Sequence, residues 1–371
     1  MKVLIAPDAF KGSLSAKQVA DALKNGLLDV DPRLDCTVFP LADGGEGTID
    51  LIAEKRGAEV ISESVPDALG NKIEAKRGRL RNGKTAVIEL AQASGITSLS
   101  RDHPAQASTY GTGLQIRRAI EEGADEIILT LGGSATVDGG TGIMQALGAM
   151  FYQGEEESKP YQNHLYHFHR VDLSALMPEA FRVKWLVLAD VNNLLTGHDG
   201  GIRIYGPQKG FTDAAIEKLE NKLLDWTAAL GVESIEDFLD QRGMGAAGGA
   251  ALPIAACFGA DICNGFEWIS NNLGLEKLIS RSDVIISGEG KIDRQTLMGK
   301  GPGQVARLAE KFHKPVIGVC GSAQDNVAAF HKIYSLSSGD VSLDDLMNSA
   351  GFYIRQVARD IGTYLSSWPG V

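Results

Sequence analysis

The sequence lacks long apolar runs, since none approaches the roughly 18 to 20 residues that span a bilayer. The apolar stretch that follows Met1 is too short for a signal peptide and is interrupted at Pro7. Cysteine is scarce, with four residues and no CxxC pair, which is typical of small core residues in a reducing compartment rather than of a disulfide framework. These absences predict a cytoplasmic protein with no membrane partner.

Clustered positive charge is also missing. The 36 lysines and arginines are outnumbered by 47 aspartates and glutamates, and the formal net charge is −11. A nucleic-acid surface needs gathered Lys and Arg side chains, so no nucleic-acid partner is expected. Small molecules are the expected partners, and an anionic one has to be bound by helix dipoles and single cations rather than attracted by a long-range field. The sequence leaves the oligomeric state open.

No standard nucleotide motif is present. Gly299-Lys300 is followed by glycine, and Arg294 stands where the first glycine of a Walker A motif belongs. Residues 243–248 match GxGxxG in letters, but they follow the polar segment 235–242 instead of a buried strand, so the match indicates close packing of small residues. A nicotinamide-dependent enzyme is therefore disfavoured.

Glycine, in contrast, is abundant with 44 residues, and a glycine-rich loop at 132–142 separates the apolar run 126–131 from a predicted helix that starts near 143. Glycines let an anion approach the backbone, the following helix start supplies unpaired N–H groups, and Ser and Thr add hydroxyl donors. The loop therefore predicts a phosphate site, with a turn that holds no ligand as the alternative. The predicted phosphate-binding residues are Gly132, Gly133, Ser134, Ala135 and Thr136.

Four further loops follow apolar runs and carry acids, lysine or amides, most of them together with glycine. They span residues 6–13, 42–48, 189–193 and 287–293. In open parallel sheets the ligand crevice lies at the carboxyl ends of the strands. We therefore expect these loops to gather with the glycine-rich loop at one site.

The length of 371 residues favours two domains over a single core. The first segment repeats the order strand, loop, helix, which predicts parallel strands. Ser15 followed by Gln18 predicts a capping box at the start of its first helix, and Asn82-Gly83 predicts a hairpin that interrupts this order. We expect an α/β fold with two α/β domains around a cleft. One is a discontinuous doubly wound parallel-sheet (Rossmann/flavodoxin-like) domain of residues 1–66 and 285–371, and the other is a mixed α/β inserted domain of residues 67–284.

Six ordered motifs together resemble the glycerate kinase type-1 family, and the likeness extends from Met1 past Gly321. The motifs are Ala6-Pro-Asp-Ala-Phe-Lys-Gly-Ser-Leu-Ser15, Ala42-Asp-Gly-Gly-Glu-Gly-Thr48, Thr109-Tyr-Gly-Thr-Gly113, Gly132-Gly-Ser-Ala-Thr-Val-Asp-Gly-Gly140, Tyr205-Gly-Pro-Gln-Lys-Gly210 and Gly288-Glu-Gly-Lys-Ile-Asp-Arg-Gln-Thr296. The resemblance implies ATP-dependent phosphorylation of D-glycerate, usually to 2-phosphoglycerate rather than 3-phosphoglycerate, with Mg²⁺. Two departures stand out: relatives carry Asn-Pro-Leu where this chain has Asn193-Leu-Leu195, and residues 151–172 differ from the family pattern.

Phosphoryl transfer requires positioned groups and neutralised charge. We expect Asp190 or Asp293 to deprotonate the glycerate hydroxyl, and Lys11 or Lys300 to neutralise charge on the transferred group. Besides the glycine-rich loop, the residues expected to contact ATP are Gly288, Glu289, Gly290 and Lys300. Those expected to bind glycerate are Asp8, Ser13, Asn192, Asn193 and Arg294.

Asp43 and Glu46 are candidate ligands of Mg²⁺, which takes one or two carboxylates together with phosphate oxygens. The alternative interpretation makes them acids of a first helical turn, favoured by the helix dipole. Lys209 stands between turn formers, a geometry that presents an ammonium to a phosphate but equally describes an exposed turn.

Two other functions remain as alternatives to a kinase. The first is a non-catalytic two-lobed protein that binds or senses a hydroxyacid. The second is a nicotinamide-dependent hydroxyacid dehydrogenase, whose two-lobed fold is superficially similar.

Overall fold

The structure is a computed structural model of the chain, and its backbone divides into two compact units. Unit 1 comprises residues 1–42 and 269–371, and unit 2 comprises residues 43–268. The residues that the structure describes are 1–42, 44–96, 104–293, 296, 301–323, 329–337 and 342–368. Among them, no helix combines the length and the apolar character that crossing a bilayer requires.

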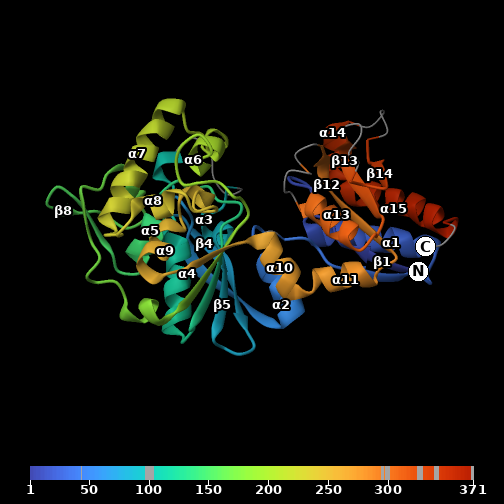
Figure 1. The fold of residues 1–371 in the computed structure, drawn as a ribbon, viewed down its shortest axis with the longest axis horizontal. Coiled ribbons are helices and arrows are strands. Elements are labelled where there is room, and N and C mark those ends of the chain that lie inside the picture. Colours follow the sequence, from blue (N-terminus) through green and yellow to red (C-terminus); the bar gives the residue numbers. More distant parts are fainter. Residues whose placement is uncertain are drawn as a thin grey trace. The chain divides into compact units, whose positions relative to one another are not determined.

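Unit 1 is built on a five-stranded sheet in the order β14-β13-β12-β1-β2, and all four pairings are parallel. The strands are β1 (Lys2–Ile5), β2 (Asp35–Val38), β12 (Val284–Ile292), β13 (Val316–Ala323) and β14 (Lys332–Ser335). Counted within the unit, this is the strand order 2-1-3-4-5 of flavodoxin-like folds. The doubly wound parallel sheet built from both ends of the chain is therefore confirmed, and blue and red segments interleave in this unit (Figure 1).

The helices of unit 1 are α1 (Ala16–Val30), most of α10 (Gly265–Leu273), α11 (Leu275–Arg281), α13 (Gly301–Lys311), α14 (Leu343–Asn348) and α15 (Ala350–Ser366). The predicted capping box starts α1, since Ser15 accepts from the Gln18 N–H and Gln18 accepts from the Ser15 N–H. Helices α1 and α15 pack closely because Gly26 has no side chain, and a Cβ there would lie 2.4 Å from the Arg355 carbonyl oxygen. Arg355 also pairs with Asp29 across this contact.

Unit 2 contains a mixed six-stranded sheet in the order β11-β10-β6-β5-β4-β3. The strands are β3 (Ala58–Pro66), β4 (Lys72–Leu80), β5 (Thr85–Glu89), β6 (Glu126–Thr130), β10 (Lys184–Ala189) and β11 (Asp261–Asn264). The four strands from β5 to β11 are parallel, whereas β3 and β4 are antiparallel. The predicted hairpin at Asn82-Gly83 is confirmed as the turn between β4 and β5, where Gly83 has φ 69°.

The remaining elements of unit 2 cover this sheet and extend from it (Figure 1). A small antiparallel sheet forms from β7 (Met150–Gln153), β8 (Glu156–Glu157) and β9 (Arg170–Asp172), which lies in the segment that departs from the family pattern. The helices are α2 (Thr48–Arg56), α3 (Leu90–Ser94), α4 (Tyr110–Glu121), α5 (Thr141–Ala146), α6 (Gly201–Tyr205), α7 (Asp213–Ala229), α8 (Ile235–Leu239) and α9 (Leu252–Phe258).

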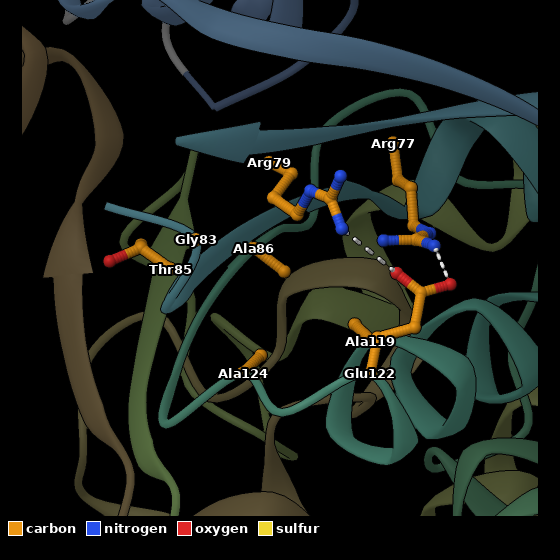
Figure 2. Close-up of a pocket in the computed structure, with 8 residues that line it drawn as sticks. All are labelled: Arg77, Arg79, Gly83, Thr85, Ala86, Ala119, Glu122 and Ala124. Carbon is orange, nitrogen blue, oxygen red and sulfur yellow. Dashed lines mark hydrogen bonds and ion pairs between the residues drawn. The ribbon is translucent and has the colours of Figure 1, made fainter. Parts of the chain in front are cut away.

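A buried arginine ties the antiparallel part of the sheet to α4. Arg77 on β4 is 2% exposed and pairs with Glu63 on β3 and Glu122 after α4. Figure 2 shows Arg77 and Arg79 both directed at the Glu122 carboxylate. The cavity beside them holds about 10 Å³, room for no more than one water, so the cluster is a structural ion-pair network rather than a ligand site.

The boundaries between the units differ from those expected from the sequence. The expected boundaries were 66/67 and 284/285, whereas the structure divides at 42/43 and 268/269. The first difference arises because β3 pairs with β4 along its whole length and so belongs to the second sheet. The second arises because α11 packs against β1 and α13 of unit 1.

Candidate active-site loops

Unit 1 brings residues from both ends of the chain together where the chain leaves β1 and along the second half of β12. These two neighbouring strands mark the point where the strand order reverses, which is where doubly wound sheets bind ligands. The Asp8 N–H donates to the Gly288 carbonyl oxygen at 2.8 Å. A Cβ on Gly290 would lie 4.0 Å from the Lys11 backbone nitrogen, so the exposed Lys11 belongs to the same place.

Two acidic residues of this place are buried. Glu289 is 7% exposed and its Oε1 accepts from the Thr296 hydroxyl at 2.7 Å. Asp293 is 8% exposed, its N–H donates to Thr296 Oγ1 at 3.1 Å, and Lys291 Nζ lies 3.4 Å from its carboxylate. Thr296 is thus hydrogen-bonded to both Glu289 and Asp293.

Close packing explains one glycine of this segment. A Cβ on Gly288 would lie 1.9 Å from the Val319 carbonyl oxygen, so β12 and β13 can pair here only with glycine. The Ser13 hydroxyl, predicted to bind glycerate, donates instead to the Met347 carbonyl oxygen at 2.6 Å. Three further predicted residues, Asp43, Arg294 and Lys300, lie outside the described residues.

In unit 2 the glycine-rich loop follows β6 and contacts the loop before α2. The Gly132 N–H donates to the Gly44 carbonyl oxygen at 2.9 Å, and a Cβ on Gly132 would lie 2.5 Å from Gly45 Cα. The Ala135 N–H donates to the Ser94 carbonyl oxygen at 2.9 Å. These two N–H groups are therefore occupied within the protein, and the loop is held in place by its neighbours.

The start of α5 does not supply the unpaired N–H groups that were expected there. The fully buried Asp138 carboxylate accepts from the N–H groups of Gly140 and Gly142 and from both the N–H and the hydroxyl of Thr109. The Thr109 hydroxyl oxygen accepts in turn from the Ile143 N–H. An internal acid thus occupies N–H groups at the start of α5 that the sequence suggested for a phosphate, so the expectation of free N–H groups at this helix start was wrong.

Lys209 is the functional candidate that sequence reasoning left undecided. It is 7% exposed, and its Nζ donates to Ser134 Oγ and to the Thr136 carbonyl oxygen, both at 2.9 Å. Burial lowers the pKa of Lys209 to about 8, and Asp190 and Asp138 only partly offset this shift. The available signal was its place in one of the six motifs, since the turn around it is not otherwise distinctive.

The loop after β10 gathers Asp190 and the two predicted amides. Asn192 is exposed. The Asn193 side chain accepts from the Tyr205 hydroxyl and donates to the Asp199 carbonyl oxygen, both at 3.0 Å. These bonds, together with the fully buried Leu195, hold the turn in which relatives carry proline.

The fit of Mg²⁺ rests on Glu46, which is exposed on the loop that contacts Gly132. Among the described residues, no three His, Cys, Asp or Glu side chains form a preformed metal site. One exposed carboxylate suits Mg²⁺, because this ion completes its shell with water and phosphate oxygens. The chemistry of the exposed Glu46 carboxylate therefore fits that of a first Mg²⁺ ligand.

Glu89, at the end of β5, binds the first turn of α2, the helix that follows the loop carrying Glu46. It is 1% exposed, and its carboxylate accepts from the Ile49 N–H at 2.6 Å and from Gln92 Nε2 at 3.0 Å. Burial raises the pKa of Glu89 to about 7, against the two hydrogen bonds, and Asp50 and Glu46 add to the rise. The folded protein therefore retains this proton to higher pH than the unfolded chain does.

Replacing Glu89 with glutamine is expected to remove a pH dependence of stability. The raised pKa stabilises the wild-type fold fully below pH 4.5, the ordinary pKa of a glutamate, and this contribution is lost as the pH rises through about 7. Between pH 4.5 and pH 8 the free energy of unfolding of the wild type should fall by about 3 kcal/mol relative to Glu89→Gln. Denaturant unfolding of both proteins at the two pH values measures this difference. If the free energy of unfolding changes by the same amount in both proteins, the raised pKa does not belong to Glu89.

Comparison with known proteins identifies the family to which this chain belongs. The profile of the glycerate kinase family matches residues 3–366. The chain belongs to the glycerate kinase family. It is 38% identical to Glycerate 2-kinase of Escherichia coli, over 99% of this chain and 98% of that protein. It is 36% identical to Glycerate kinase of Bacillus subtilis, over 97% of each chain.

A solved structure from Salmonella typhimurium LT2, assigned as a glycerate kinase 2, supports the same conclusion. It is 36% identical, covers 99% of this chain and 98% of its own, and superposes with a TM-score of 0.80. The family membership predicted from the six motifs is thus confirmed, and so is the mixed α/β fold with parallel sheets. A member of this family is an enzyme, a kinase that acts on a small molecule.

Proposed function

We propose that this chain transfers the γ-phosphoryl group of ATP to D-glycerate, and that the product is 2-phosphoglycerate rather than 3-phosphoglycerate. The observation that carries the proposal is the pair of loops at Gly132 and Gly44, packed backbone to backbone beyond the end of β6. The N–H groups of Gly132 and Ala135 are occupied in this junction. The buried hydroxyls of Ser134 and Thr136 are therefore the groups that would contact phosphate oxygens. The alternatives, a hydroxyacid sensor and a nicotinamide-dependent dehydrogenase, lack a comparable feature in their favour.

In unit 2, the proposed roles are binding of ATP by the glycine-rich loop and binding of substrate oxygens by two asparagine side chains. Residues 132–136 cradle the phosphates of ATP. The buried Thr136 hydroxyl supports this fit, because it has no hydrogen-bond partner among the described residues. Asn192 and Asn193 offer amides to substrate oxygens, although the Asn193 side chain must exchange an internal bond to do so.

The proposed roles in unit 1 concern charge and the acceptor. Lys11 neutralises charge on the transferred group, and Asp8 contacts glycerate. Ser13 contacts glycerate as well, for which its hydroxyl must exchange its bond to the Met347 carbonyl oxygen. Gly288, Glu289 and Gly290 line the approach to the phosphates. Arg294 and Lys300 keep the roles expected from the sequence. Asp190 in unit 2 or Asp293 in unit 1 deprotonates the glycerate hydroxyl.

Mg²⁺ is proposed as the metal, held by Glu46 and Asp43 with oxygens of ATP. When bound, it neutralises charge that develops on the phosphate oxygens. The cytoplasm is the proposed compartment, on the basis of the composition and the scarcity of cysteine in the sequence.

The test is an assay of the purified chain with ATP, Mg²⁺ and D-glycerate, with L-glycerate as the control substrate. We expect release of ADP that depends on D-glycerate, and a phosphorus NMR spectrum identifies the phosphorylated hydroxyl. Glycerate binding without ADP release would instead favour the sensor. A change in nicotinamide absorbance would favour the dehydrogenase.

A further inference from the structure

We propose that Lys209 and Ser134 form a coupled donor pair that binds an anionic oxygen of a substrate, with the ammonium setting the direction of the serine hydroxyl. The inference deepens the proposed function and rests on it for the identity of the anion. Phosphoryl oxygens of ATP and the carboxylate of glycerate share the required chemistry. The experiment distinguishes these two sources.

The direction of the hydroxyl follows from donor and acceptor counts. An ammonium group has three hydrogens and no acceptor, so in the contact with Lys209 the Ser134 oxygen must be the acceptor. The hydrogen of Ser134 is then left to donate to a third atom. In the described part of the chain, the bond from Lys209 is the one contact of Ser134 Oγ, and Ser134 is 8% exposed.

The charge of Lys209 points to an anion as that third atom. A buried ammonium is costly unless a counter-charge lies beside it. The acidic groups that act on Lys209 are Asp190 after β10 and Asp138 before α5. Asp138 already accepts four hydrogen bonds, and within the described residues the hydrogen bonds given for the Lys209 ammonium go to a hydroxyl and a carbonyl oxygen rather than to a carboxylate.

If Lys209 only held the glycine-rich loop in place, it would not need a positive charge. The bonds to Ser134 and to the Thr136 carbonyl oxygen could be made by a neutral donor, without the cost of burying an ammonium. Burial lowers the pKa of Lys209 to about 8, and a bound anion would shift the pKa upward again. Affinity for the anion should therefore fall as the pH rises through this value.

The experiment compares Lys209→Met, Ser134→Ala and the double variant with the wild type. Lys184→Met is the matched control, because it removes an exposed positive charge at the opposite end of β10. Affinities for ATP alone and for D-glycerate alone are measured by calorimetry at pH 7 and pH 9. Circular dichroism and thermal melts establish that each variant is folded.

We expect Lys209→Met to weaken binding of one of the two ligands by roughly 10- to 100-fold, and that ligand identifies the anion. Ser134→Ala should add little to Lys209→Met, because the orientation of the hydroxyl depends on the lysine. The decrease in affinity from pH 7 to pH 9 should be present in the wild type and the control and absent in Lys209→Met.

The inference is overturned if folded Lys209→Met binds both ligands as tightly as the wild type, or if the two substitutions weaken binding additively. If Lys209→Met cannot be purified folded, Ser134→Ala decides: unchanged affinity for both ligands rejects the donor pair. If the wild type phosphorylates glycerate but the variants bind ATP and D-glycerate as tightly as it does, the inference is wrong and the proposed function stands. If the wild type shows no turnover but Lys209→Met weakens binding of one ligand, the proposed function is wrong and the inference stands.

Discussion

Asparagine in place of the catalytic base is expected to lower kcat by roughly 10²- to 10⁴-fold, because the hydroxyl of glycerate then keeps its proton during attack. Asp293 and Asp190 are the two candidates. The backbone N–H of Asp293 donates to Thr296 Oγ1, and Asp190 acts electrostatically on Lys209. Steady-state kinetics of Asp293→Asn and Asp190→Asn with ATP and D-glycerate measure the effect. The base is the residue whose replacement lowers kcat while KM for ATP is little changed.

Asp225→Asn is the control for this pair of variants. Asp225 is an exposed aspartate of α7 whose ion pair with Lys222 is local, so its replacement should leave the kinetics unchanged. If Asp190→Asn and Asp293→Asn both keep turnover near that of the wild type, neither residue is the base. Loss of fold in either variant is detected independently by circular dichroism.

Alanine at Gly132 is expected to lower kcat/KM by roughly 100-fold, since a displacement of about 1 Å in a binding loop has an effect of this size. The added Cβ would lie 2.5 Å from Gly45 Cα and 2.9 Å from the Gly45 backbone nitrogen. Backbone atoms cannot rotate away as a flexible side chain can, so the two loops must separate. Kinetics together with a thermal melt measure both the catalytic and the structural consequence.

Gly351→Ala in α15 is the matched control for Gly132→Ala. The atom nearest to its added Cβ is Leu14 Cδ1 at 3.9 Å, an ordinary contact, and alanine favours a helix more than glycine does. Activity should be unchanged and the melting temperature equal or higher. If Gly132→Ala is as active as this control, the contact between the two loops does not position the site.

Local signals in the sequence predicted local features well. The capping box at Ser15 and Gln18 and the hairpin at Asn82-Gly83 are each set by a few neighbouring residues, and the structure contains both. The alternation of strand, loop and helix predicted the parallel sheet of unit 1, because such crossovers allow few other arrangements. The order of six motifs predicted the family.

Features that depend on distant partners were not predicted. The sequence around 132–142 indicates a glycine loop before a helix, but it does not indicate that Asp138 caps that helix together with Thr109, 29 residues away. Lys209 lies in an unremarkable turn, and its importance follows from a bond to Ser134, 75 residues away. The boundary near residue 66 was misplaced because strand pairing, not the composition of β3, assigns it to a sheet.

The sequence alone determined the fold class, the parallel sheet of unit 1, the family and the set of polar loops, because periodicity, turn residues and ordered motifs are properties of short segments. The tertiary structure decided which N–H groups of the glycine loop are occupied, where Glu89 and Lys209 are buried, and which glycines stand against a neighbouring backbone. These outcomes depend on the burial and the partners that folding gives to residues far apart in the chain, and burial is what shifts the pKa of a carboxyl or an ammonium.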